Sequence, residues 1–295
     1  MIETRRDMQL HDRICIVTGG GRGIGEAVAR ACAREGAQVT VASRTMSELE
    51  NVAQSITEDG GRATAVRADV ADPTEVHDLV TVTLERHGRV DLLINAAGVY
   101  GPIGYAWEAD PDEWATAISI NLLGTFLCCQ AVLPHMVTRR EGRIVNFAGG
   151  GAATPLARFS AYAASKAAVV RLTETLAQEV REFNVFVNAI APGAVDTKLQ
   201  DDVLAAGERA GDLWERIQKL RQTGEGGVGP EVAADLAVYL GSDSCGLLTG
   251  KLISAPHDRW RTWEVSDFDR LSSSAWLTLR RIDEFTLTGL PPFSA

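Results

Sequence analysis

The sequence ICIVTGGGRGIG at residues 14–25 decides the fold. An apolar run typical of a buried β-strand leads into a cluster of glycines, and a helix-forming run follows directly. Glycine lets the chain turn sharply and approach a ligand closely, while the start of a helix offers free N–H groups and a positive dipole end. The glycines at 19, 23 and 25 therefore predict a strand, a turn and a helix that bind the pyrophosphate of a dinucleotide. A merely flexible turn is the alternative.

Beyond this stretch, short β-rich runs alternate with longer helical patterns. The runs include QVTVAS, RATAVRAD, VDLLINAAG, GRIVNFAG and FNVFVNAIAPG, and helices are expected near residues 24–35, 46–58, 73–87 and 230–240. This order predicts an α/β fold, a doubly wound (Rossmann) parallel sheet with helices on both faces. We expect one dinucleotide-binding and catalytic domain over residues 1–255. The polar stretch 198–229 is expected to form a mobile helical lid.

A C-terminal extension, residues 256–295, follows that domain and is too short for a core of its own. We expect it to pack on the domain or on a neighbouring subunit. Trp260 and Trp263 are interpreted as core anchors, with stacking on a substrate as the alternative.

Composition narrows the class of partner. The chain has 295 residues, 45% of them apolar, and a net charge of −10, which would repel nucleic acids and anionic membranes. Its five cysteines form no CxxC pair, its five histidines suggest no metal cluster, and its polar start does not read as a signal peptide. No uninterrupted apolar stretch is expected to reach membrane-spanning length. These features favour a soluble, cytoplasmic protein with reduced cysteines and a small-molecule partner, without metal.

Tyr162 and Lys166 lie four residues apart in the helix-forming run SAYAASKAAVVRL. This spacing places both side chains on one helix face, about one turn apart. A nearby ammonium favours the phenolate and so moves the tyrosine toward acid/base work. Tyr162 is therefore the leading catalytic candidate, although the same spacing also occurs by chance on surface helices.

The end of the second strand indicates the cofactor. An NAD enzyme places Asp or Glu there to bind the ribose hydroxyls, but this chain has Ser43 and Arg44. Together with Arg22 in the glycine turn, Arg44 could clamp a 2′-phosphate. The sequence therefore predicts a preference for NADP(H) over NAD(H). Solvated surface arginines are the alternative.

Taken together, these motifs make the chain resemble the short-chain dehydrogenase/reductase family in its single-domain form. The resemblance runs from about residue 13 to 253 and rests on the glycine turn, ADV, NAAG, ISINLLGTF, the Tyr162–Lys166 pair and PGAVDT. With the residues above, it implies the following cofactor-binding set: Gly19, Arg22, Gly23, Ile24, Gly25, Ser43, Arg44, Asp69, Val70, Asn95, Ala96, Gly98, Tyr162, Lys166, Pro192, Gly193, Val195 and Thr197.

The resemblance also implies the reaction: hydride transfer between NADP(H) and a ketone or secondary alcohol. Tyr162 would be the general acid/base, Lys166 its partner, and Asn121 the anchor of a water linked to the lysine. Asn121 could instead only satisfy a backbone carbonyl at a helix kink. An epimerase or dehydratase working through a transient ketone, and a non-catalytic dinucleotide-binding sensor or scaffold, are the alternatives. A homodimer or homotetramer is expected.

One position departs from the family pattern. A serine usually stands thirteen residues before the tyrosine, where this chain has Gly149. The glycine run at 149–151 is expected either to enlarge the pocket or to offer backbone N–H groups in place of the hydroxyl. Thr154 or Ser160 could also supply a hydroxyl. The expected substrate residues are Gly149, Gly150, Tyr100, Trp107 and Trp214.

Overall fold

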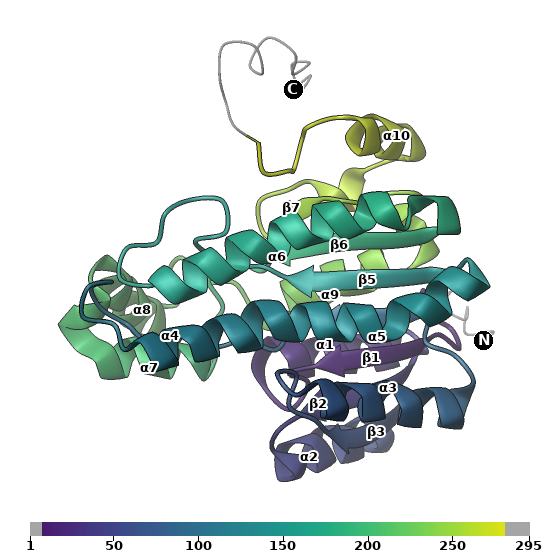
Figure 1. Cartoon of the computed structure of the whole chain (residues 1–295), viewed down its shortest axis with the longest axis horizontal. Helices are drawn as coiled ribbons and strands as arrows, with labels where there is room; N and C mark the ends of the chain where they lie inside the picture. The colour runs from purple at the N-terminus through teal and green to yellow at the C-terminus, as the bar shows by residue number, and fades with distance from the viewer. Residues whose placement is uncertain (1–7, 281–295) are drawn as a thin grey trace, which may run out of the picture.

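Seven parallel strands form one sheet in the computed structural model, which describes residues 8–280 (Figure 1). The strands are β1 (Ile14–Thr18), β2 (Gln38–Ser43), β3 (Arg62–Arg67), β4 (Leu92–Asn95), β5 (Gly142–Phe147), β6 (Val185–Ala191) and β7 (Leu252–Ser254). Their order in the sheet is β3-β2-β1-β4-β5-β6-β7, so the direction of winding reverses beside β1. The predicted doubly wound sheet is confirmed, and the crevice of such a sheet opens at the carboxyl ends of β1 and β4.

Helices cover both faces of the sheet. One face carries α1 (Gly23–Arg34), α2 (Met46–Glu58) and α9 (Pro230–Gly241), and the other carries α3 (Pro73–His87), α5 (Gly124–Arg139) and α6 (Ser160–Glu179) (Figure 1). Helix α4 (Pro111–Ile118) and the π-helical turn η1 (Ser119–Leu123) precede α5 directly. Short 3-10 turns are η2 (Arg181–Phe183), η3 (Gly207–Ala210), η4 (Asp243–Cys245) and η5 (Trp260–Thr262).

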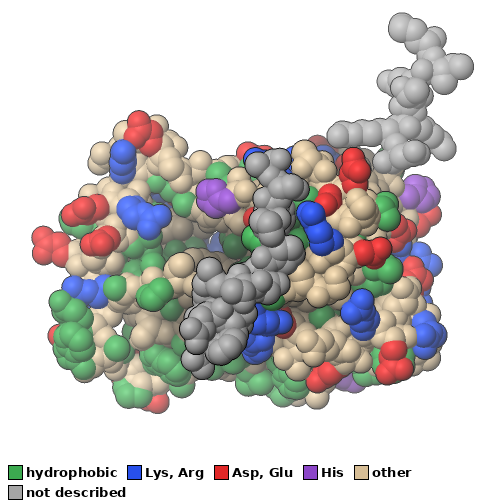
Figure 2. Space-filling view, turned by 90° about the horizontal axis from the view of Figure 1, so that it is seen from above, with side chains coloured by type: hydrophobic (Ala, Val, Ile, Leu, Met, Phe, Trp, Pro, Cys, Tyr) green, Lys and Arg blue, Asp and Glu red, His purple; other side chains and the backbone are tan. Residues whose placement is uncertain are grey.

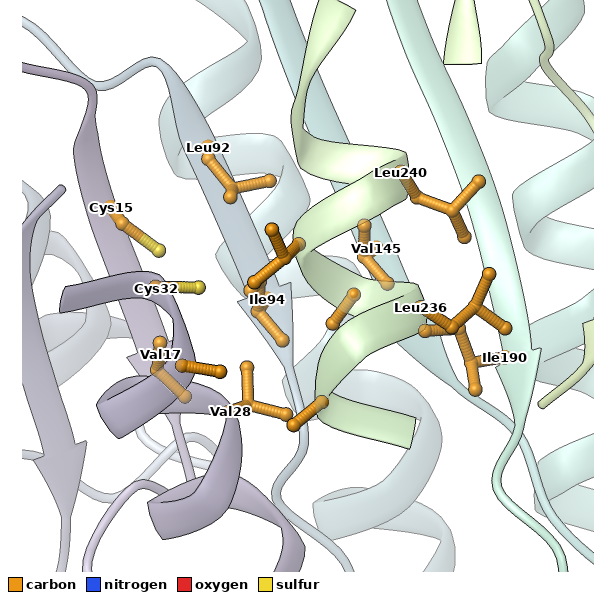
Figure 3. Close-up of a cluster of buried hydrophobic side chains, with 14 of the residues drawn as sticks. Cys15, Val17, Val28, Cys32, Leu92, Ile94, Val145, Ile190, Leu236 and Leu240 are labelled. Atoms are coloured by element: carbon orange, nitrogen blue, oxygen red, sulfur yellow. The ribbon is translucent and has the colours of Figure 1, made fainter. Parts of the chain in front are cut away.

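Side-chain alternation along the strands divides the core into two layers. Cys15 and Val17 of β1 pack toward α1 and α9, while Ile16 between them packs on the opposite face. Figure 3 shows the first layer, in which Val28 of α1 and Leu236 of α9 meet the side chains of the central strands. Successive residues of a strand point to opposite faces, so a strand covered on both faces is apolar at most of its positions. This explains why the strands read as continuous apolar runs.

The ends of α3 show how local sequence sets element boundaries. The Asp72 carboxylate caps the helix by accepting hydrogen bonds from the N–H groups of Thr74 and Glu75, and Pro73 occupies the first helical position. Gly88 ends the helix with φ of 74°, a left-handed conformation that glycine adopts without a Cβ penalty.

Helices α4, η1 and α5 join into one 29-residue helix, Pro111–Arg139, whose most apolar window has a mean hydropathy of 1.7. By length and composition alone this helix could cross a membrane, although polar residues such as Ser119, Asn121 and Gln130 interrupt its apolar sequence. Such values are weak evidence, because a core helix of a soluble protein meets the same criteria. One side of this helix packs against the sheet through Cys129, Val132 and Met136. Over the whole window, 39% is buried inside the molecule.

The stretch expected to form a lid contains α7 (Leu199–Ala206) and α8 (Asp212–Thr223). Arg221 of α8 ties this region together, since its guanidinium lies 2.9 Å from the Asp196 carboxylate and 2.7 Å from that of Asp201. The apolar sides of both helices pack into a cluster with Tyr100 and Tyr162. The segment therefore covers the side of the molecule where the predicted catalytic tyrosine lies.

The described part of the extension packs on its own domain. Trp260, together with Phe268 and Leu271 of α10 (Val265–Ser273), is buried in the main core cluster. The edge strand β7 is also covered, because the N–H of Leu252 donates a hydrogen bond of 2.7 Å to the carbonyl oxygen of Leu277. Residues 281–295 of the predicted extension lie outside the described residues.

Replacing Trp260 with alanine should test the contribution of this packing. Trp260 is 4% exposed and its indole N–H donates to the Ala255 carbonyl oxygen at 3.0 Å, so the substitution should lower the free energy of unfolding by about 3–5 kcal/mol. Trp107 is 76% exposed, and its replacement should change that free energy by less than about 0.5 kcal/mol. Urea denaturation of both variants measures the difference, and equal losses would contradict a core role for Trp260.

Acidic and basic side chains are interspersed over the face of the molecule shown in Figure 2. Among the described residues on that face, no wide basic stripe of the kind that binds a phosphate backbone is present. The five cysteines are all buried and unpaired.

Candidate functional site

A cavity of about 320 Å³ opens where the sheet order reverses, at the carboxyl ends of β1, β2 and β4. Its walls contain many of the predicted cofactor residues: Gly19, Arg22, Gly23, Ile24, Gly25, Ser43, Arg44, Asp69, Val70, Ala96, Gly98 and Thr197. The tertiary fold thus gathers residues from five separate stretches of sequence around one hollow.

The glycine turn approaches the neighbouring chain closely. Gly19 has φ of +67°, and a Cβ at this position would lie 2.7 Å from the backbone nitrogen of Ala97, so only glycine fits. Helix α1 then begins at Gly23 without a side-chain cap from Arg22, which leaves its first N–H groups without a side-chain acceptor. A pyrophosphate suits this position, because those groups and the helix dipole attract an anion.

The residues expected to determine the cofactor specificity lie at the far end of the cavity, after β2. The Ser43 hydroxyl is buried and has no hydrogen-bond partner among the described residues. Arg44 is exposed beside it, and Arg22 reaches the same wall. A buried hydroxyl without a hydrogen-bond partner costs free energy unless a ligand forms that hydrogen bond. This end of the cavity therefore fits a polar group of a bound molecule.

Tyr162 and Lys166 lie one turn apart near the start of α6, and both are buried. The Lys166 ammonium donates a hydrogen bond of 2.8 Å to the Phe147 carbonyl oxygen at the end of β5, and it lies 5.8 Å from the centre of the Tyr162 ring. Burial lowers the pKa of Lys166 to about 8, because desolvation disfavours the charged amine.

Burial also raises the pKa of Tyr162 above its usual value, and the nearby Tyr100 adds to the effect. This direction is opposite to the lowering expected from the spacing of the pair. The reason is that two effects on the phenolate oppose each other. The apolar surroundings disfavour the phenolate, and this effect is stronger than the favourable effect of the Lys166 amine, which lies 5.8 Å from the centre of the ring. In this state of the protein the phenol is held protonated, as a proton donor must be.

The glycine at 149 lies directly against Tyr162. A Cβ at this position would clash with the Tyr162 hydroxyl oxygen, so a glycine here leaves room for the phenol. Gly150 faces open space and is exposed. None of the hydrogen bonds within residues 8–280 involves the Tyr162 hydroxyl, which keeps that group available to a ligand.

Asn121 lies in the π-helical turn η1 and is fully buried. Its side-chain amide donates to the Val99 carbonyl oxygen and to the Ser165 hydroxyl, each at 2.9 Å, and its side-chain oxygen accepts from the Val99 N–H at 2.9 Å. Asn121 therefore ties the segment after β4 to α6. A π-helical turn is rare and often marks a functional site.

Several predicted cofactor residues lie away from the cavity wall. The Asn95 amide donates to the Asn146 side-chain oxygen at 2.9 Å inside the core, so its side chain joins β4 to β5 rather than lining the hollow. The following predicted residues are also absent from the lining: Tyr162, Lys166, Pro192, Gly193 and Val195. Gly98 connects the two regions, because a Cβ on it would lie 3.3 Å from the Lys166 ammonium.

The expected substrate residues separate into two groups. The Tyr100 ring packs edge-on against Tyr162 with 4.8 Å between ring centres, and its hydroxyl donates to the Gln200 side-chain oxygen at 3.2 Å. Burial raises the pKa of Tyr100 to about 12. Trp214 packs on the same cluster. Trp107 lies outside this cluster, because it stacks on Tyr105 at the surface with 4.2 Å between ring centres and is 76% exposed.

Some residues of the site were not identified from the sequence. Phe159, Gln200, Glu48 and Lys198 all belong to the cavity wall or to the cluster around Tyr162. No local motif marks these residues, because helices distant in sequence bring them there. Within the part of the chain that the structure describes, no group of three or more His, Cys, Asp or Glu side chains is arranged to hold a metal ion.

Comparisons with known proteins agree with this architecture. A family model described as short chain dehydrogenase matches residues 13–207. The 2,3-dihydro-2,3-dihydroxybenzoate dehydrogenase of Bacillus subtilis (strain 168) is 34% identical over 244 residues, which are 81% of this chain and 93% of that protein.

Two solved structures are also similar. The actinorhodin polyketide ketoreductase with NADPH has a TM-score of 0.76 at 30% identity, covering 82% of this chain and 95% of its own. The NAD+-bound xylitol dehydrogenase has a TM-score of 0.78 at 27% identity, covering 83% of this chain and 98% of its own. These neighbours bind different nicotinamide cofactors.

Proposed function

Because the chain belongs to the short-chain dehydrogenase family, and so is an oxidoreductase that acts on alcohols and ketones with NAD(P), we propose that it uses NADP(H) and that Tyr162 is its general acid/base. The observation that carries the proposal is the Tyr162 hydroxyl, which lies against Gly149 without a hydrogen-bond partner among the described residues. The relatives are named dehydrogenases and reductases, so the alternative of a non-catalytic subunit is not retained.

The cofactor supplies or accepts the hydride when it is bound. In the direction of reduction, Tyr162 donates its proton to the oxygen of the substrate carbonyl, and in oxidation it takes that proton back. Lys166, held by the Phe147 carbonyl oxygen, places a cation beside the phenol and lowers the cost of its ionisation. Asn121 positions α6 through Ser165, and we propose that it also anchors a water linked to Lys166.

The choice of NADP(H) rests on the end of β2. Ser43 and Arg44 stand there in place of a carboxylate, and a buried Ser43 hydroxyl without a partner suits a phosphate oxygen. The two solved neighbours bind NADPH and NAD+, so the support comes from these residues and not from the comparisons.

Replacing Arg44 with aspartate tests the cofactor proposal. The new carboxylate should repel the 2′-phosphate and raise KM for NADPH at least about tenfold relative to NADH. Arg209→Asp is the control, because Arg209 is also exposed but lies outside the cavity. Steady-state kinetics with both cofactors measure the ratio. A ratio unchanged in Arg44→Asp would show that Arg44 does not select the cofactor.

We also propose that the protein is a cytoplasmic homodimer or homotetramer, since enzymes of this family are commonly oligomeric. Leu123 and Phe126, on the outer side of the long helix, are 43% and 37% exposed and support an apolar contact between subunits.

A further inference from the structure

Glu48 is a cavity residue with a charge that opposes the proposed ligand. It lies in the first turn of α2 and lines the cavity together with Ser43 and Arg44. A Cβ placed on Gly21 would lie 3.1 Å from the Ser43 hydroxyl and 3.5 Å from the Glu48 carboxylate, so both groups border the same small space. A carboxylate at this point repels a phosphate, and its presence therefore requires an explanation.

Two cations hold this carboxylate. The Arg22 guanidinium in the glycine turn lies 3.3 Å from one Glu48 oxygen, and the Lys198 ammonium, just before α7, lies 3.9 Å from the same oxygen. In the described part of the chain, Glu48 is the one acidic partner that either cation has. The Glu48 side chain is 30% exposed, so it has room to turn toward solvent.

We propose that Glu48 is an internal competitor for the 2′-phosphate of the cofactor, and that Arg22 and Lys198 exchange the carboxylate for the phosphate when NADP(H) binds. This inference rests on the proposed use of NADP(H). It makes Glu48 a specificity-determining residue, because its presence weakens the attraction of the site for a 2′-phosphate while leaving a ribose hydroxyl unaffected.

Charge explains why the exchange proceeds. A phosphate monoester carries about −1.5 to −2 charges and three acceptor oxygens, against one charge on a carboxylate. It therefore attracts the two cations more strongly than Glu48 does, and it also offers an acceptor to the unpartnered Ser43 hydroxyl. NAD(H) has no anion at this position, so with NAD(H) the Glu48 ion pairs persist.

The exchange also involves the segment that covers Tyr162, because Lys198 belongs to it. Lys198 follows Thr197, a cavity-lining residue, and directly precedes α7, which packs on the cluster around Tyr162. When Lys198 exchanges Glu48 for the phosphate, the contact of this end of α7 with α2 is replaced by a contact with the ligand. Lys198 therefore links the phosphate site to the segment that covers Tyr162.

The test compares two small probes by isothermal titration calorimetry. Adenosine 2′,5′-bisphosphate carries the 2′-phosphate, and adenosine 5′-monophosphate lacks it. Glu48→Gln should bind the bisphosphate about tenfold more tightly than the wild type does, because one repulsive charge has gone. Its affinity for the monophosphate should change less than about twofold. Glu50→Gln, on the same helix at an exposed position without an ion pair among the described residues, controls for net charge.

A double-mutant cycle tests whether Glu48 competes with the phosphate for Lys198. Lys198→Gln should weaken bisphosphate binding more in the Glu48→Gln background than in the wild type, because only there is Lys198 free of its carboxylate. Equal effects of Glu48→Gln and Glu50→Gln, or no gain in Glu48→Gln, would overturn the inference.

The same measurements separate this inference from the proposed cofactor. A wild-type protein that binds both probes equally would refute the NADP(H) assignment. If Glu48→Gln then acquired a preference for the bisphosphate, the role of Glu48 would still be supported. If the wild type prefers the bisphosphate and Glu48→Gln does not bind it more tightly, the NADP(H) assignment stands and the competition does not.

Discussion

Replacing Tyr162 with phenylalanine is expected to lower kcat by about 10²–10⁴-fold, since this removes the proton donor and acceptor of the reaction. The fold should be retained, because the Tyr162 hydroxyl forms no hydrogen bond among the described residues, and the cofactor affinity should be retained because Tyr162 is not part of the cavity wall. The phenyl ring keeps the packing against Tyr100. Steady-state kinetics on a panel of ketones, with NADPH binding followed by fluorescence, separate these effects.

Tyr105→Phe is the matched control for the loss of a phenol hydroxyl. Tyr105 is 40% exposed and stacks with Trp107 at the surface, so this variant should keep wild-type kcat. Wild-type rates in Tyr162→Phe would refute the proposed mechanism. A fall in NADPH affinity as large as the fall in kcat would instead indicate that the hydroxyl acts in binding.

Replacing Gly149 with serine restores the hydroxyl that the family usually carries, yet we expect it to reduce kcat by on the order of 10²-fold. A Cβ at 149 clashes with the Tyr162 hydroxyl oxygen, so the phenol must move by a sizeable fraction of an ångström. Displacements of about 1 Å in a catalytic group typically cost about that factor. The loss should appear in kcat, because the cofactor cavity does not include Gly149.

Two further variants give this prediction its controls. Gly149→Ala introduces the same Cβ without a hydroxyl and should reduce kcat as much as Gly149→Ser does. Gly150→Ser places a hydroxyl one residue away, where a Cβ meets nothing within 4 Å, and should leave kcat unchanged. A rise in turnover in Gly149→Ser alone would show that Tyr162 adapts and that the missing hydroxyl limits the natural enzyme.

Much of the fold could be predicted from short-range patterns. The apolar runs predicted the six longer strands, and the glycine turn predicted the position of the cavity at the end of β1. These features depend on neighbours in sequence: alternation along a strand, glycine at a positive φ, and one helical turn between Tyr162 and Lys166. A helix around Asn121 was expected, but its full extent, Pro111–Arg139, was not predicted.

The chemistry of the site depended more on tertiary structure. Sequence spacing predicted that Lys166 would acidify Tyr162, but the cluster of apolar side chains around the phenol raises its pKa instead. Desolvation is a sum over all neighbours in space, so no spacing along one helix can reveal it.

The sequence by itself thus determined the parallel sheet, the glycine-turn end of the cavity and the placing of Tyr162 and Lys166 on one helix face, because each is marked by a pattern that spans only a few residues. Only the tertiary structure decided that Gly149 makes room for the Tyr162 hydroxyl and that Glu48 stands between Arg22 and Lys198. Both relations join residues from separate elements, and their distances are set by how the helices pack on the sheet.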